Sequence, residues 1–457
     1  MKKGILYTLL LVSNVMLANV TLPSIFSDHM VLQKNEDVKF WGWASPGEVV
    51  EISPSWTNTV YKVTTTSEAK WELNVKTPKA GSGYTITISG YNKIIINDVL
   101  IGEVWLCSGQ SNMEMAASWG IENGDEEVAK ANHNTIRFFR VEKSTAEYPQ
   151  DHIIGEWEVC TPETMNNNSA VAYFFATQLQ QQLKNAPVGL IISSWGGTPA
   201  EIWMPETIFK NDEIIAEAAH NLQANDWGPT QPAKAFNAMI YPIVGYNVAG
   251  TLWYQGESNV GSLVYGKTLS ALITSWRTLW QDNFPFYIVQ IAPYDDGYTH
   301  FGSVAIRDAQ RKVVNTLDHT EMVVISDIAP TDDIHPKNKK SVGQRLANLA
   351  LKKQYKVIDT LVEYPELEHV VYNHKNAVVH FKNAQGLYLS SAVSLFEIAG
   401  DDNVFYLAKT KLKGSTIIVY SNQVKQPQKV RFAWGNALQS NVFNEAGLPA
   451  SSFATEK

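Results

Sequence analysis

A serine and a histidine, each just after an apolar segment, are the side chains of this sequence best suited to covalent chemistry. Ser111 follows EVWLCS in the run SGQSNMEM, and His335 follows MVVISDIA in the run TDDIHP. A serine hydroxyl is a weak nucleophile that needs an adjacent base, commonly a histidine. A helix beginning near Ser111 would direct unpaired backbone N–H groups at a developing oxyanion. The pair therefore predicts two-step acyl transfer, with Ser111 as nucleophile and His335 as base.

Two aspartates in the loop before His335 are alternative candidates for the carboxylate that would orient the base. Asp332 lies three residues before His335, and Asp333 lies two residues before it. Either carboxylate could fix the tautomer of the imidazole ring. We prefer Asp332 for its D-x-x-H spacing, with Asp333 as the alternative. A catalytic dyad with no essential acid also stays open.

Two further polar turns follow apolar segments. The run SSWGGTPAE contains Gly196 and Gly197, and the run QGESN contains Gln255, Glu257 and Asn259. Glycine lets a backbone N–H approach a ligand closely, and a side-chain amide can donate to the same oxyanion. By themselves the glycines could equally shape a connection between a strand and a helix.

The apolar segments before these turns have the pattern of buried strands. They lie at 103–108, 188–194, 249–254, 285–292 and 322–329. Between them, apolar residues recur at helical spacing: Val171, Phe175, Leu179 and Leu183, then Leu269, Leu272, Ile273, Trp276 and Trp280. Strands alternating with helices predict an α/β fold with a parallel sheet covered on both faces. Such sheets carry their sites at the carboxyl ends of the strands, where every candidate motif falls.

The chain divides into four predicted segments. Residues 1–18 have two lysines before a short apolar run, as in a secretory signal peptide, which predicts a secreted or periplasmic protein with no membrane span in its mature form. Residues 19–99 alternate apolar and polar side chains as a β-sandwich does, residues 100–352 form the α/β catalytic domain, and residues 353–457 return to β alternation.

Composition excludes several classes of function. The net charge of -8 and the absence of a Lys/Arg cluster argue against nucleic acid as a partner. The sequence has no compact group of His, Cys and Asp of the kind that a metal site requires, and we expect no cofactor. Cys107 and Cys160 are the two cysteines, which we expect to be buried thiols rather than a disulfide. The oligomeric state is not predicted.

The motifs together resemble the SGNH hydrolases, and within them the sialate O-acetylesterase family and its acetylxylan-esterase relatives. The similar runs occur in the family's order: LPSIFSDHMVLQ, GEVWLCSGQSNMEM, SSWGGTPAEIW, FNAMIYPI, WYQGESN, DDIHPKNKKSVGQRLA and NEAGLPASSFAT. The resemblance implies a three-layer, flavodoxin-like fold with accessory β-sandwich modules on both sides. It also implies Ser111 as nucleophile, His335 as base, and the N–H groups of Ser111 and of Gly196 or Gly197 as oxyanion donors.

One motif departs from the family's pattern. The third SGNH motif usually supplies an asparagine donor, and this chain has QGESN there. Gln255 is therefore the first candidate for the amide donor and Asn259 the second. Glu257 either orients the base or holds its loop. Gln110 and Asn112, which flank the nucleophile, are candidates for contacting or supporting the substrate.

The resemblance implies an O-acetylated sugar as substrate. Sialic acid acetylated at O9 is the first expectation, from the family's naming, and acetylated plant polysaccharide is the alternative. A sialate carboxylate requires a cation, preferably arginine, and Arg307 is the candidate clamp unless it is only a surface ion-pair member. The rival from another class is a non-catalytic carbohydrate-binding protein, which would not need the serine and histidine present in this chain.

Overall fold

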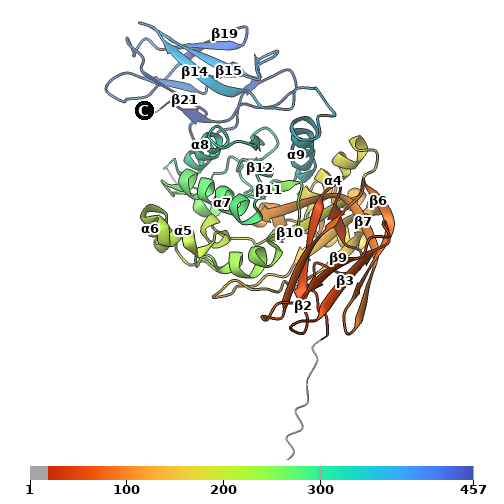
Figure 1. The fold of residues 1–457 in the computed structure, drawn as a ribbon. Helices are drawn as coiled ribbons and strands as arrows, with labels where there is room; N and C mark the ends of the chain where they lie inside the picture. Colours follow the sequence, from red (N-terminus) through yellow and green to blue (C-terminus); the bar gives the residue numbers. More distant parts are fainter. Residues whose placement is uncertain (1–18, 296, 298–300, 456–457) are drawn as a thin grey trace, which may run out of the picture.

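The centre of the computed structural model is a mostly parallel β-sheet (Figure 1). The structure describes residues 19–295, 297 and 301–455, so the predicted signal peptide lies outside the described residues. The strand order is β13-β12-β11-β7-β10-β8-β9, and β9 alone in this row runs antiparallel to its neighbour. The strands are β7 (Lys93–Gly109), β8 (His133–Val141), β9 (Gly155–Cys160), β10 (Val188–Ser194), β11 (Gly250–Tyr254), β12 (Phe286–Val289) and β13 (Thr320–Val323).

Helices cover both faces of this sheet. Successive side chains of β7 point to opposite faces and are all buried at its C-terminal end, so each face must be covered. Val104 and Leu106 belong to a core that includes side chains of α7 (Tyr265–Trp280) and α8 (Gly302–Val314). Trp105 and Cys107 point to the opposite core, with α4 (Ala170–Gln182) and α9 (Lys339–Lys353). The predicted α/β architecture is confirmed. The shorter helices are α1 (Ser111–Glu114), α2 (Gly124–Lys130), α3 (Pro162–Asn167), α5 (Glu206–Asn211) and α6 (Glu213–His220).

The N-terminal β module shares a strand with the central sheet. The first part of the 17-residue strand β7 pairs with β6, and its last part pairs with β10 and β11. The predicted boundary at residues 99 and 100 therefore falls inside a continuous strand. The module's core is also continuous with the α7 side of the sheet. Its strands are β1 (Val31–Gln33), β2 (Asp37–Trp43), β3 (Val49–Pro54), β4 (Tyr61–Thr64), β5 (Lys70–Lys76) and β6 (Gly81–Ser89).

The C-terminal β module, drawn in blue in Figure 1, has a separate core. Its two four-stranded sheets have the orders β14-β15-β20-β19 and β18-β17-β21-β23, and β16 pairs with β22. The strands are β14 (Glu366–Tyr372), β15 (Ala377–Lys382), β16 (Tyr388–Leu389), β17 (Phe396–Ala399), β18 (Tyr406–Leu407), β19 (Lys409–Lys413), β20 (Thr416–Tyr420), β21 (Lys429–Phe432), β22 (Val442–Phe443) and β23 (Phe453–Ala454).

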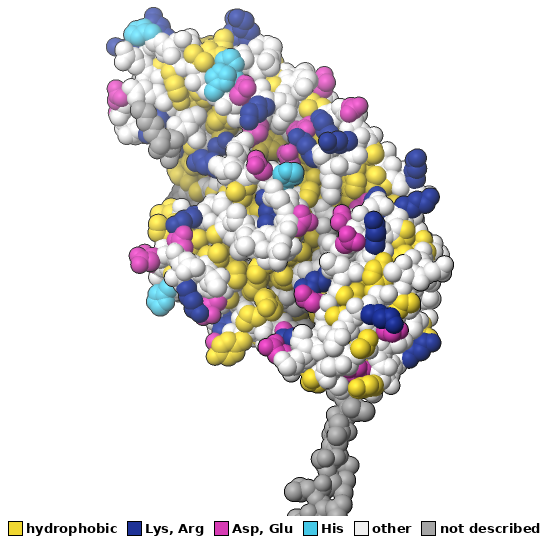
Figure 2. Space-filling model, in the orientation of Figure 1, with side chains coloured by type: hydrophobic (Ala, Val, Ile, Leu, Met, Phe, Trp, Pro, Cys, Tyr) yellow, Lys and Arg dark blue, Asp and Glu magenta, His cyan; other side chains and the backbone are white. Residues whose placement is uncertain are grey.

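On the face shown in Figure 2, acidic and basic side chains are interspersed, and no large patch of Lys and Arg gathers there. Within the described residues no helix combines the length and apolarity needed to cross a bilayer. Cys107 and Cys160 are buried and unbridged, as expected.

Candidate active site

The end of β7 places Ser111 at the carboxyl edge of the sheet. Gly109 has φ 132°, and a Cβ added there would lie 2.2 Å from the carbonyl oxygen of Tyr254 at the end of β11. Only glycine allows this approach of the two strand ends. The backbone N–H of Gln110 then donates to the Tyr254 carbonyl at 3.0 Å. The short helix α1 begins at the next residue, Ser111.

The candidate base reaches this serine from the loop between β13 and α9. The ring Nε2 of His335 lies 2.8 Å from the Oγ of Ser111. Burial lowers the pKa of His335, and the positive charge of Lys339 lowers it further, while Asp333 opposes the shift. The imidazole is therefore neutral at pH 7 and can accept the serine proton.

The preference for Asp332 over Asp333 is corrected by the geometry of the loop. The Oδ1 of Asp333 accepts the backbone N–H of His335 at 2.8 Å, whereas Asp332 is exposed. Across the described chain, neither carboxylate is hydrogen-bonded to the imidazole ring. Asp333 thus contacts the backbone that carries the candidate base, and the side-chain partner of the ring is Ser111.

A buried polar cluster beside the dyad joins the loops of the two reacting side chains. Asn112 is fully buried, and its Nδ2 donates to Glu257 Oε1 at 2.7 Å and to the Ile334 carbonyl at 3.0 Å. Its Oδ1 accepts from Lys339 Nζ at 2.5 Å. Ile334 directly precedes His335, so Asn112 ties the base's loop to the nucleophile. Glu257 accepts a hydrogen bond from Asn112, and it is linked to the loop of His335 only through that amide.

Lys339 is the residue of this cluster that the sequence did not single out. It is 1% exposed, and burial lowers the pKa of its ammonium group to about 7. Its signal in the sequence is weak, because it stands among Lys337 and Lys340 at the start of a helix, where solvated lysines are ordinary. The four-residue spacing from His335 would have been the clue.

The backbone donors expected for an oxyanion differ in their availability. Within the described residues, the N–H groups of Ser111 and Gly197 have no acceptor. The N–H of Gly196 donates to Glu114 Oε2 at 2.8 Å, and the other oxygen of that carboxylate pairs with Lys143. A Cβ added to Gly196 would lie 3.3 Å from Ser111 Cβ, which puts this turn directly against the nucleophile.

The predicted side-chain amide donors are not free to act, which corrects two expectations. Both N–H groups of Gln255 are used, toward the Thr198 carbonyl at 3.3 Å and toward Asn259 Oδ1 at 2.7 Å. The Asn259 amide donates to both oxygens of the buried Glu201. These amides therefore stabilise the turn beneath the site. Gln110 has a similar role, because its Oε1 accepts from the backbone of the QGESN loop.

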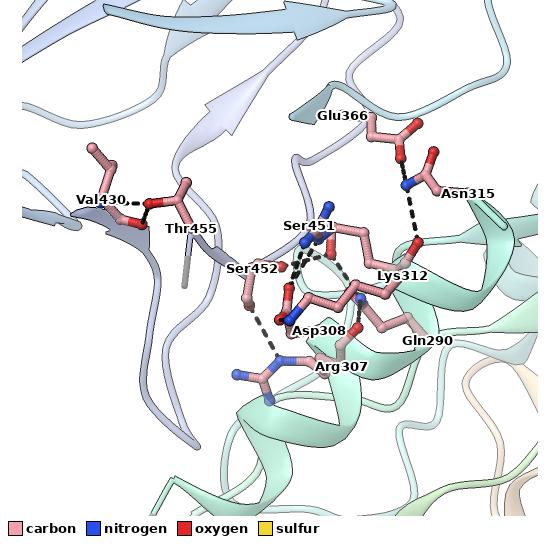
Figure 3. Close-up of polar contacts among 11 residues, drawn as sticks. Gln290, Arg307, Asp308, Lys312, Asn315, Glu366, Val430, Ser451, Ser452 and Thr455 are labelled. Atoms are coloured by element: carbon pink, nitrogen blue, oxygen red, sulfur yellow. Dashed lines mark hydrogen bonds and ion pairs between the residues drawn. The ribbon is translucent and has the colours of Figure 1, made fainter. Parts of the chain in front are cut away.

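Arg307 is not a substrate clamp. Its side chain is fully buried, and its guanidinium donates to the carbonyls of Gly435 and Asn436 at 2.6 and 3.0 Å, and to Ser452 Oγ at 3.3 Å. Figure 3 shows it directed from α8 toward the C-terminal segment, beside Gln290, which donates to Ser451 Oγ. It joins the C-terminal module to α8.

The described residues contain no cluster of three or more His, Cys, Asp or Glu side chains arranged to hold a metal ion. The groups that this edge of the sheet offers for chemistry are the Ser111 hydroxyl, the His335 imidazole and backbone N–H donors.

Comparisons with known proteins place the chain among carbohydrate esterases. Residues 101–352 match the family described as carbohydrate esterase, sialic acid-specific acetylesterase. The sialate O-acetylesterase of Homo sapiens is 30% identical over 362 residues, covering 71% of this chain and 69% of that protein. That of Mus musculus is 28% identical, covering 71% of each.

A solved structure gives the same result for the whole fold. The crystal structure of a carbohydrate acetylesterase from Xanthomonas citri covers 96% of this chain and 100% of its own, with a TM-score of 0.86 and 32% identity. The likeness includes both β modules, since nearly the entire chain is covered. The chain therefore belongs to the sialic acid-specific acetylesterase family of carbohydrate esterases and is an esterase.

Proposed function

We propose that this esterase removes acetyl groups from O-acetylated sugars by acyl transfer through Ser111. The observation that carries the proposal is the 2.8 Å separation between Ser111 Oγ and His335 Nε2 at the carboxyl edge of the sheet. A nucleophile and base within hydrogen-bond reach are the minimum that such chemistry requires.

The proposed mechanism uses Ser111 and His335 as a nucleophile–base dyad. Neutral His335 takes the proton of Ser111 as the oxygen attacks the acetyl carbonyl. The resulting imidazolium then protonates the departing sugar alcohol and leaves an acetyl-enzyme. Water, deprotonated by the same imidazole, releases acetate and regenerates the serine. Asp333 supports this cycle through the backbone of the base rather than through its ring.

Backbone N–H groups stabilise the tetrahedral oxyanion in this mechanism. The N–H groups of Ser111 and Gly197 are the donors, because both lack an acceptor in the described part of the chain. The Gly196 N–H is not counted among them, because it donates to the Glu114 carboxylate. Each such donor contributes on the order of 10²–10³ to the rate in comparable enzymes.

Two acetylated sugars fit this chemistry. The names of the curated relatives favour O-acetylated sialic acid, and acetylation at O9 is the form that we propose first. Acetylated plant polysaccharide is the second substrate, and it gains weight because Arg307, the cation expected to bind a sialate carboxylate, is buried away from solvent.

The decisive experiment compares Ser111→Ala with Ser82→Ala, a change at an exposed position of the N-terminal module. Ser111→Ala should abolish acetate release from 4-nitrophenyl acetate and keep the circular dichroism spectrum of the parent protein, whereas Ser82→Ala should retain full activity. Turnover by Ser111→Ala above the background rate would refute the assigned nucleophile.

We also propose that the chain is exported, that a β-sandwich module of residues 353–457 follows the catalytic residues 100–352, and that the N-terminal module predicted at residues 19–99 is joined to them through strand β7. The charged and apolar pattern of residues 1–18 supports export, and the separate C-terminal core supports the last boundary. N-terminal sequencing of the secreted protein should begin at residue 19; a chain that starts at residue 1 would contradict the export proposal.

A further inference from the structure

A cavity of about 940 Å³ adjoins the loop that carries the candidate nucleophile. Glu114 and Ala116, which follow Ser111 in the chain, form part of its wall. Ser194, at the end of β10, lines it as well, just before the Gly196 turn that touches Ser111. The rest of the wall comes mainly from β8, β9, α3 and the turn at residues 118–119. The Glu114 carboxylate connects this cavity to the nucleophile's loop, because it accepts the N–H of Gly196, which lies against Ser111.

The side chains of this wall suit a sugar. Trp119 lines the cavity with 48% of its surface exposed, so its ring can stack on the apolar face of a pyranose. Asn168 and Ser194 are also in the wall, 2% and 5% exposed. Each has a side-chain oxygen with no hydrogen-bond partner within the described residues. These oxygens lie beneath the surface of the wall, so the side chain that a sugar can contact directly here is Trp119.

The charge of the wall discriminates between sugars. It contains five carboxylates and two cations: Glu114, Glu142, Glu156, Glu158 and Glu163, with Arg140 and Lys143. Lys143 already pairs with Glu114, and Arg140 stands opposite Glu156 in the β8–β9 pair. The excess of negative charge opposes an anionic ligand and leaves an uncharged one unaffected.

We propose that this cavity binds the saccharide part of the substrate and that this saccharide is an uncharged acetylated sugar rather than a sialic acid. The inference rests on the proposed esterase function and deepens it by naming the substrate class. It assigns Trp119 as a residue that binds the sugar next to the acetyl group under attack.

The charge argument is tested by salt dependence. The parent protein is assayed for acetate release from acetylated xylo-oligosaccharides and from O-acetylated sialic acid, between about 10 mM and 500 mM NaCl. We expect a higher kcat/KM for the neutral sugar, unchanged by salt, and a sialate kcat/KM that rises about threefold as salt screens the repulsion. A higher kcat/KM for the sialate than for the neutral sugar would overturn the proposal. So would a sialate kcat/KM that falls with salt, because it would indicate that the cavity attracts the anionic sugar.

The position of the sugar is tested by Trp119→Ala. We expect about a tenfold loss of kcat/KM for acetylated xylo-oligosaccharides, mainly through KM, and no change for 4-nitrophenyl acetate, which has no sugar to stack. Tyr91→Ala, at another exposed aromatic residue in a turn of the N-terminal module, is the matched control and should match the parent protein on both substrates. An equal loss on both substrates, or no loss on the saccharide, would refute the assignment of Trp119.

These outcomes are separable from a failure of the esterase mechanism. If Ser111 is not the nucleophile, Ser111→Ala still hydrolyses 4-nitrophenyl acetate, whatever the sugar preference. If only the cavity is wrongly assigned, Ser111→Ala is inactive and Trp119→Ala keeps its activity on the saccharide.

Discussion

Replacing Asn112 by alanine tests whether the buried amide beside the nucleophile positions the catalytic base. The side chain is completely buried and makes three hydrogen bonds, to Glu257, to the Ile334 carbonyl and to Lys339. Alanine removes all three and leaves the loop before His335 without its tie to α1. We therefore expect effects on both folding and turnover.

The structure sets the size of both effects. Two of the three bonds of Asn112 join ionisable partners, and one joins a carbonyl, so their loss should lower the free energy of unfolding by about 4 kcal/mol. A displacement of the imidazole by about 1 Å costs roughly a hundredfold in rate. We expect kcat on 4-nitrophenyl acetate to fall about a hundredfold at 25 °C, with KM nearly unchanged.

Asn444 provides a matched control for this experiment. It is also completely buried and also makes three hydrogen bonds, with Glu363, Asn383 and Leu448, but it belongs to the C-terminal module. Asn444→Ala should lower the free energy of unfolding by about 3 kcal/mol, because its three partners are backbone groups. Its kcat should stay within about twofold of the parent protein, since the nucleophile and base are not moved.

Urea titration and initial-rate measurements on both variants decide the matter. A kcat for Asn112→Ala within about threefold of the parent protein, together with a clear loss of stability, would show that the amide supports the fold alone. An equal loss of kcat in Asn444→Ala would show that general destabilisation lowers turnover, and would refute the positioning role in the same way.

Three further outcomes follow from the charges and burial of the site. Burial and Lys339 lower the pKa of His335, so its active neutral form persists below the usual pKa of about 6.5. The kcat/KM on 4-nitrophenyl acetate should therefore reach half its maximum at a pH below about 6.5. A midpoint above that pH would contradict the lowered pKa. Lys339→Met removes the opposing charge, so the pKa of His335 rises and the midpoint moves to higher pH, whereas Lys340→Met, at an exposed ion pair, should not move it. Arg307→Met leaves three acceptors of the C-terminal module without their donor, so it should lower the free energy of unfolding, measured by urea titration, by about 4 kcal/mol with kcat retained. The same change at the exposed Lys312 should lower that free energy by under about 1 kcal/mol. Equal losses in the two variants would refute the anchoring role of Arg307.

The architecture was predictable because apolar periodicity reports burial directly. The segment 188–194 is apolar on both sides of the strand, and β10 occupies the same residues, buried on both faces. The boundaries were less predictable. The apolar run 322–329 was expected to be one strand, yet β13 ends at Val323, because hydrophobicity continues into the turns that cross the sheet edge. The boundary predicted at residue 99 likewise falls inside β7, because no sequence signal marks where one continuous strand changes its pairing partners.

The positions of Ser111 and His335 were predictable for a different reason. Each follows a strand of one parallel sheet, and such strands end at a common edge, so residues far apart in the chain meet there. Sequence could not say which nearby polar side chains remain free. That depends on hydrogen bonds between loops, as with Asp333, whose carboxylate is used by the backbone N–H of His335.

The wrongly assigned donors show why side-chain type alone misleads at such an edge. Where parallel strands end, backbone groups leave the sheet ladder and need new partners. Gln255 donates to the Thr198 carbonyl and Gln110 accepts the loop N–H groups, so amides that look catalytic are used to satisfy the turn. In the described residues the scaffold does not use the N–H groups of Ser111 and Gly197, and the Nε2 of His335 has Ser111 Oγ as its partner. In the proposed mechanism the reacting groups are therefore those that the turns do not use, and they can be identified only after every neighbouring hydrogen bond has been assigned.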